Sequence, residues 1–169
     1  MQKILVSACL LGAKVRYHGG DAACDHPILQ RWLDEGRLVA VCPERDGGLP
    51  TPRPAAEIVG PGAGHGVVAG LASVRTSTGA DVTAAFRRGA DIALEAVRQH
   101  RIRIAVLKDG SPSCGSSFVY DGTFSGARVA DRGVTAALLE SHGVRVFTER
   151  TLEAAHAWLE EMERVDRER

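Results

Sequence analysis

The sequence predicts an α/β fold: a single three-layer domain with a Rossmann-like, mainly parallel sheet of about four strands. Short apolar segments typical of buried strands alternate along the chain with longer segments whose apolar residues recur at helical spacing. The segments between successive strands are long enough for the crossover connections that parallel strands require. The 169 residues contain no internal repeat and no linker, so we expect one domain over residues 1–169.

Four segments have the short, apolar character of buried strands. They are residues 3–7, 38–41, 102–107 and 144–147. Because crossovers between parallel strands bring all the carboxyl ends to one edge of a sheet, we expect the segments that follow these strands to meet there.

Helices are predicted between and after these strands. The first covers residues 27–35, and Asp25 is its expected N-cap. The apolar residues expected to face the sheet are Ile28, Leu29, Trp32 and Leu33. Three further helices are predicted over residues 81–100, over residues 134–141, and from Thr148 or Thr151 into the charged tail. Asp81 is the expected N-cap of the second helix, and the tail, residues 160–169, is expected to be a solvated, frayed helix end.

Three segments are less regular. Residues 46–66 hold many of the prolines and glycines and predict a long irregular loop, of a kind that is usually functional or mobile. Residues 67–76 predict a short strand or a hairpin. Residues 118–124 predict a tight turn between extended pieces, with Asp121 and Gly122 at the turn.

The composition is that of an ordinary globular protein and excludes several classes of partner. With 21 basic and 21 acidic residues, the chain has no net positive charge to attract a nucleic-acid backbone, so we expect no nucleic-acid polymer as a partner. No apolar run approaches the ~20 residues that a membrane span requires, and the first residues lack the layout of a signal peptide. We therefore expect a cytoplasmic protein whose four cysteines stay reduced, which favours metal binding or thiol chemistry over disulfides.

Three of the cysteines share one kind of position. Cys9 follows the first predicted strand, Cys42 follows the second, and Cys114 lies in the loop after the third. A parallel sheet would bring them to one edge, where three thiolates can hold a metal ion or a cluster and leave one coordination position open. Cys24 lies away from any strand end and is interpreted as a small buried hydrophobe. Three loop histidines are alternatives for a fourth ligand or are simply surface residues: His18, His26 and His65.

Polar residues near these cysteines have two interpretations each. Glu44 is either a general base beside a metal centre or a surface charge. The hydroxyls of Ser111 and Ser113 are interpreted either as groups that orient a substrate or pass a proton, or as hydrogen-bond partners of backbone groups in the turn. Arg53 either contacts a substrate carbonyl or is a structural hydrogen-bond donor. The residues alone leave these alternatives open.

Several motifs stand in order along the chain. They are VSACLLG at 6–12, VRY at 15–17, CPE at 42–44, GGLPTPRP at 47–54, GADVT at 79–83, LKDGSPSCG at 107–115, YDGTFSG at 120–126 and GVTAALL at 133–139. Through these motifs the chain resembles the thiouracil desulfurase (TudS) family, formerly domain of unknown function 523. The resemblance covers residues 3 to about 149, and a C-terminal helix follows. His18 departs from the aspartate expected in the first loop, and residues 128–132 lack an expected glycine.

The resemblance implies a [4Fe–4S] cluster held by Cys9, Cys42 and Cys114, with one iron that the protein does not ligate. It implies a non-redox desulfurase that removes sulfur from a thiolated pyrimidine such as 2-thiouracil and releases sulfide. Glu44 and Ser111 would be its catalytic residues. We expect Ser113 and Arg53 to bind the substrate, a small-molecule thiolated base.

Two alternatives remain beside this interpretation. One is a zinc hydrolase with three cysteine ligands and a bound water. The other is a non-catalytic cluster protein that binds sulfur or a small molecule.

Overall fold

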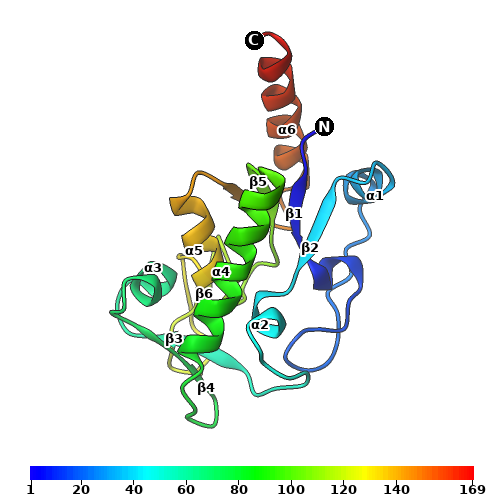
Figure 1. Ribbon diagram of the computed structural model, residues 1–169. Helices are drawn as coiled ribbons and strands as arrows, with labels where there is room; N and C mark the ends of the chain where they lie inside the picture. The colour runs from blue at the N-terminus through cyan, green and yellow to red at the C-terminus, as the bar shows by residue number, and fades with distance from the viewer.

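A four-stranded parallel sheet forms the centre of the computed structural model, which describes residues 1–169 (Figure 1). The strands lie in the order β2-β1-β5-β8, with bounds Leu38–Val41, Ile4–Ser7, Ile104–Val106 and Arg145–Phe147. The two central strands, β1 and β5, are buried along their whole length, which explains why their sequences are continuously apolar rather than alternating. The predicted α/β fold with about four parallel strands is confirmed.

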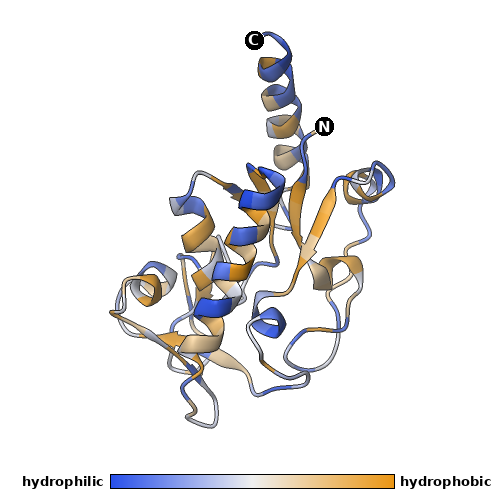
Figure 2. Cartoon of the chain, viewed as in Figure 1, coloured by the Kyte–Doolittle hydropathy of each residue, from blue (hydrophilic) through white to orange (hydrophobic).

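Helices cover both faces of this sheet and make three layers. Ile4 and Val6 point from β1 to one face, where they pack with α1 (Pro27–Asp34) and α6 (Leu152–Arg167). Leu5 points to the other face, where α4 (Thr83–His100) and α5 (Val134–Ser141) supply the apolar partners. Figure 2 shows the hydrophobic strands between helices whose outer surfaces are hydrophilic. No helix of the chain is long and apolar enough to cross a membrane.

Smaller elements extend the fold beyond the carboxyl edge of the sheet. A short 3-10 helix, η1 (Ala8–Leu11), follows β1, and α2 (Pro43–Asp46) follows β2. Strands β3 (Ala56–Val59) and β4 (Ser73–Thr76) form an antiparallel pair, and α3 (Ala63–Val68) lies between them in the sequence. A second antiparallel pair joins β6 (Val119–Tyr120) to β7 (Arg128–Val129).

The prediction of an irregular loop over residues 46–66 is wrong in part. Residues 46–55 do lack regular structure beyond the end of α2, but β3 and the start of α3 follow. The glycines of β3, α3 and their connection concealed these elements, because Gly60, Gly62, Gly64 and Gly66 each lie in close contact with neighbouring backbone. A Cβ at Gly66, for example, would overlap the Pro61 carbonyl oxygen. Of the short strand or hairpin predicted within residues 67–76, the strand is present as β4, and it pairs with β3.

Helix ends differ from the prediction in detail. His26, not Asp25, is the N-cap of α1, and its Nδ1 atom accepts a hydrogen bond from the Ile28 backbone N–H at 3.1 Å. Leu33 does not face the sheet, because 48 % of it is exposed. Val82, not Asp81, is the N-cap of α4; the Asp81 side chain accepts hydrogen bonds from the N–H and hydroxyl of Thr83, the first helical residue.

Two further predictions are corrected. The turn at 118–124 is wider than expected, because β6 pairs with β7 and the loop between them covers residues 121–127. The charged tail is not frayed, because α6 continues to Arg167 and Glu163 pairs with Arg37 at 2.7 Å. Met162 on the same helix is buried, which further anchors the tail.

Candidate active site

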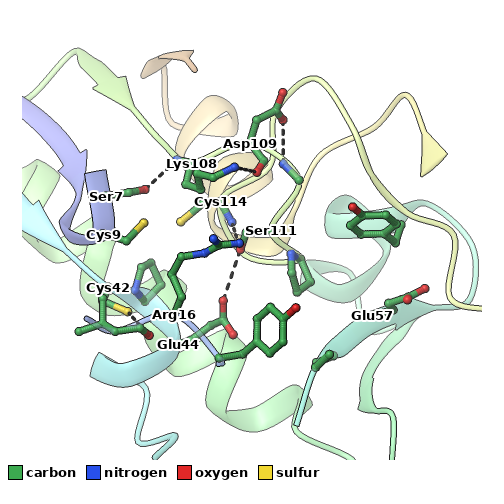
Figure 3. Close-up of a pocket in the computed structure, with 18 of the residues that line it drawn as sticks. Ser7, Cys9, Arg16, Cys42, Glu44, Glu57, Lys108, Asp109, Ser111 and Cys114 are labelled. Atoms are coloured by element: carbon green, nitrogen blue, oxygen red, sulfur yellow. Dashed lines mark hydrogen bonds between the residues drawn. The ribbon is translucent and has the colours of Figure 1, made fainter. Parts of the chain in front are cut away.

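A cavity of about 660 Å³ lies at the sheet edge where β1, β2 and β5 end (Figure 3). The segments that follow these strands line one side of it. β3 and the β6–β7 hairpin line the other side and bring aromatic residues, among them Phe118 and Tyr120. The volume and the mixed polar and aromatic lining are typical of a small-molecule site.

Cys9, Cys42 and Cys114 all line this cavity, each at the carboxyl end of a different strand. Cys9 lies in η1, Cys42 lies between β2 and α2, and Cys114 lies in the loop after β5. All are free thiols; Cys9 and Cys114 are buried and Cys42 is half-buried. Cys24 is also free but does not line the cavity. Parallel strand order therefore brings together three residues that are far apart in sequence.

The surroundings of these thiols disfavour an uncompensated negative charge. Burial raises the pKa of Cys9 to about 11, although Arg16 and Lys108 oppose the shift. Burial also raises the pKa of Cys42 and, more strongly, that of Cys114. Three thiolates formed together would repel one another as well. A positively charged metal centre is therefore the partner that would stabilise their ionised form.

The three cysteine thiols line different parts of the cavity and do not converge on one point. No three histidine, cysteine, aspartate or glutamate side chains lie close enough together to bind a single metal ion. A [4Fe–4S] cluster binds each thiolate through a different iron, so its donors are distributed around it. The three histidines named above as alternatives do not line the cavity. The three thiols are thus the soft donors of the cavity, and soft sulfur ligands suit an iron–sulfur cluster.

The loop that carries Cys114 is organised by a buried carboxylate, Asp109. Its Oδ1 atom accepts hydrogen bonds from the backbone N–H groups of Gly110, Ser116, Ser117 and Phe118, at 3.0 to 3.4 Å. Its Oδ2 atom accepts bonds from the Ser117 hydroxyl and from Arg150. Burial opposes ionisation, but these bonds outweigh it, so the pKa of Asp109 is lowered.

The same loop docks on the N-terminus of α5. The first N–H groups of a helix have no partner within the helix. Here Val134 donates to the Pro112 carbonyl at 2.8 Å, and Thr135 donates to the Ser113 carbonyl at 2.9 Å. The preceding Gly133 allows this approach, because a Cβ there would press on the Ser113 carbonyl. Cys114 is therefore held between two anchors, Asp109 and the helix end.

Glu44 and Ser111 meet in the cavity. The Ser111 hydroxyl donates to Glu44 Oε2 at 3.3 Å and accepts the backbone N–H groups of Ser113 and Cys114, both at 3.1 Å. Arg53 donates from Nε to Glu44 Oε1 at 3.2 Å. The carboxylate is thus fixed on both oxygens, by a hydroxyl and by a guanidinium.

Ser113 and Arg53, which the sequence predicts to bind the substrate, are engaged in contacts within the protein. Ser113 is fully buried, its hydroxyl bonds that of Thr135 at 2.7 Å, and it does not line the cavity. Arg53 lines the cavity, but its guanidinium is committed to Glu44, Thr51 and the carbonyls of two further residues, and its side chain is only 5 % exposed. These contacts favour the structural interpretation of both residues.

Close backbone contact sets the position of α2, which carries Glu44. A Cβ at Gly89 of α4 would overlap the Pro43 carbonyl oxygen, and a Cβ at Gly47 would overlap the Ala85 carbonyl oxygen. Helix α2 therefore lies directly on the backbone of α4. In sequence Gly89 looks like an ordinary, slightly unfavourable residue within a helix.

Sequence reasoning gave no role to several charged residues of the site, among them Arg16, Lys108 and Asp109. Arg16 and Lys108 line the cavity, and Asp109 organises the ligand loop. Lys108 and Asp109 had a local signal, since they follow a predicted buried strand and precede a turn. The role of Arg16 required the three-dimensional arrangement.

His18 stands where an aspartate was expected. Its Nδ1 atom accepts the Gly20 backbone N–H at 3.0 Å, a short-range bond that an aspartate oxygen also makes in such turns. The ring is exposed and does not line the cavity. The departure therefore preserves the turn, and the His18 ring reaches the cavity only indirectly, by packing edge-on against Tyr17 of its wall.

Comparison with known proteins gives concordant matches. The family model for 2-thiouracil desulfurase matches residues 4–151. An uncharacterized protein of Bacillus subtilis strain 168, YbbK, is 45% identical over 149 residues, which are 88% of this chain and 97% of that protein. A solved structure described as a [4Fe-4S]-dependent thiouracil desulfidase, TudS, is 46% identical with a TM-score of 0.87, and the match covers 95% of this chain and 99% of the other.

Proposed function

The chain belongs to the 2-thiouracil desulfurase family, and from that membership we propose that it is a [4Fe–4S]-dependent, non-redox desulfurase of thiolated pyrimidines. The substrate class is a small thiolated base such as 2-thiouracil, and the products are the oxygenated base and sulfide. We assign the reaction to the cytoplasm, where thiols stay reduced.

We assign the cluster ligands to Cys9, Cys42 and Cys114. One observation carries this assignment: three thiols from three strand ends line one cavity together with a paired carboxylate and hydroxyl. When bound, the cluster would supply one iron without a protein ligand, a soft Lewis acid for the sulfur of a thiocarbonyl group.

The residues of the chain supply the proton chemistry. Glu44 acts as the general base that takes a proton from the attacking water, and Arg53 holds that carboxylate in position. The Ser111 hydroxyl, which contacts Glu44 at 3.3 Å, positions the substrate or the water. Water oxygen replaces sulfur at carbon, and the pair of electrons of the carbon–sulfur bond leaves with sulfur. No redox partner is needed, since no electrons are gained or lost overall.

The aromatic wall contributes the flat surface that a pyrimidine requires. Phe118 and Tyr120 line the cavity, and the Arg128 guanidinium covers the Phe118 ring at 4.2 Å. Stacking between such rings and a base is tolerant of the substituents on the base. This wall supports binding of a base without fixing the position of its sulfur.

The test is anaerobic reconstitution with iron and sulfide, followed by assay of sulfide release from a panel of thiolated bases. We expect about four irons per chain and turnover of 2-thiouracil. Replacing any one of the three cysteines with alanine should abolish iron binding, whereas Cys24→Ala should not. An iron-free preparation that still converts thiouracil would contradict the proposal, and zinc in place of iron would support the hydrolase alternative.

A further inference from the structure

Arg16 differs from the other charged residues of the cavity because its guanidinium makes no hydrogen bond, ion pair or aromatic contact. The remaining charged groups are committed. Glu44 pairs with Arg53, Lys108 with Glu149, and Asp109 with Arg150; Arg128 covers Phe118, and Glu57 accepts two backbone N–H groups. An unpaired charge in a partly enclosed site is costly, and such groups are characteristic of functional sites.

The position of Arg16 is nonetheless well defined. Arg53 binds both neighbouring residues: its Nη2 atom donates to the Val15 carbonyl at 2.9 Å, and its backbone N–H donates to the Tyr17 carbonyl at 2.7 Å. The Arg16 carbonyl also accepts the Gly19 N–H at 2.8 Å, which closes the turn. Figure 3 shows the Arg16 side chain extending into the cavity among the three cysteines and Ser111.

The cavity has a specific need for a positive charge. It holds three thiols and the Glu44 carboxylate, and the reaction proposed above moves a negative charge from Glu44 onto the departing sulfur. As the carbon–sulfur bond breaks, its electron pair goes to sulfur. Of the two protons of the water, one ends on Glu44 and the other on sulfur, so hydrosulfide leaves.

We propose that Arg16 is the residue that binds this sulfur anion, stabilising it as it forms and holding it until release. The inference rests on the proposed function, since that reaction supplies the anion. Arg16 is suited to it because its N–H groups are free, whereas Arg53, Lys108 and Arg150 are in ion pairs and Arg128 is held over the Phe118 ring. Lysine at this position would keep the charge, and glutamine would keep hydrogen-bonding capacity without it.

The experiment compares Arg16→Gln and Arg16→Lys with the unaltered protein, all reconstituted anaerobically. Arg87→Gln is the matched control, because Arg87 is exposed on α4 and does not line the cavity. Iron content is measured first, then sodium sulfide is titrated while the visible absorption of the cluster is followed. The kcat and KM for 2-thiouracil are measured last.

We expect Arg16→Gln to keep its iron but to require at least about tenfold more sulfide for half saturation. Its kcat should fall with little change in KM, and Arg16→Lys should recover much of both. Unchanged sulfide affinity in Arg16→Gln would overturn the inference. So would loss of iron from this variant, because that would assign Arg16 to cluster binding. If the unaltered protein converts no thiolated base, the proposed function fails, while the sulfide titration still decides the role of Arg16.

Discussion

The hydroxyl of Ser111 donates a hydrogen bond to Glu44 Oε2 at 3.3 Å, although 67 positions separate the two residues. Each residue is close in sequence to a proposed cluster ligand, Cys42 for Glu44 and Cys114 for Ser111. The segments that follow β2 and β5 therefore meet at the sheet edge, where with η1 they supply both the ligand set and the acid–base pair. The catalytic geometry depends on the same parallel sheet edge as the metal site.

Glu44→Gln should separate catalysis from cluster binding. The amide cannot accept a proton from water, so we expect kcat for 2-thiouracil to fall by about 100-fold or more. Iron content and visible absorption should not change, because Glu44 is not a proposed ligand. Glu95→Gln, on the exposed side of α4, is the control. Normal turnover in Glu44→Gln would refute the role of Glu44 as a base.

Arg53→Gln should distinguish positioning of Glu44 from contact with the substrate. The loss of its bonds to Glu44 Oε1 and the Val15 carbonyl should disorder both partners. We therefore expect a lower kcat at nearly constant KM for 2-thiouracil. A large rise in KM with unchanged kcat would restore the interpretation of Arg53 as a substrate-binding residue.

The fold could be predicted from sequence because it depends on local patterns. Apolar runs identified the central strands, helical periodicity identified α1 and α4, and the alternation of strands and helices indicated a parallel sheet. From the sheet followed the meeting of Cys9, Cys42 and Cys114 at one edge.

What could not be predicted depends on contacts between distant segments. The capping role of His26, the fully bonded state of Arg53 and the isolation of Arg16 are properties of neighbours brought together by folding. Strand β3, and so its pairing with β4, was obscured by glycines that allow close backbone packing. Local propensity is overridden at such positions.

Gly89→Ala should displace α2 and with it Cys42 and Glu44. Alanine favours a helix interior by about 1 kcal/mol over glycine, but its Cβ would overlap the Pro43 carbonyl oxygen. We expect net destabilisation of about 1–3 kcal/mol, measured by urea unfolding, together with reduced iron content. The helix-propensity control is Arg87→Ala on the exposed side of α4. Stabilisation by Gly89→Ala would show that α2 does not rest on α4 as described.

Asp109→Asn should loosen the loop that carries Cys114. The neutral amide cannot match the charge-assisted bonds from Ser117 and Arg150, so we expect a loss of about 2 kcal/mol in unfolding free energy at pH 7. Arg150 is 60 % exposed, so part of its interaction is screened by solvent. Iron content after reconstitution should fall as well, whereas Asp91→Asn on α4 should alter neither.

The pH dependence of this effect has a definite sign. The pKa of Asp109 is lowered in the folded protein, so the stability that it contributes is present above the unfolded pKa of about 3.9. That contribution is lost as the pH falls through the folded pKa. In the metal-free proteins, urea unfolding should therefore show a difference between the original chain and Asp109→Asn that is constant near neutrality and shrinks below about pH 4. A difference that stays constant down to pH 3 would mean that the charge of Asp109 does not stabilise the loop.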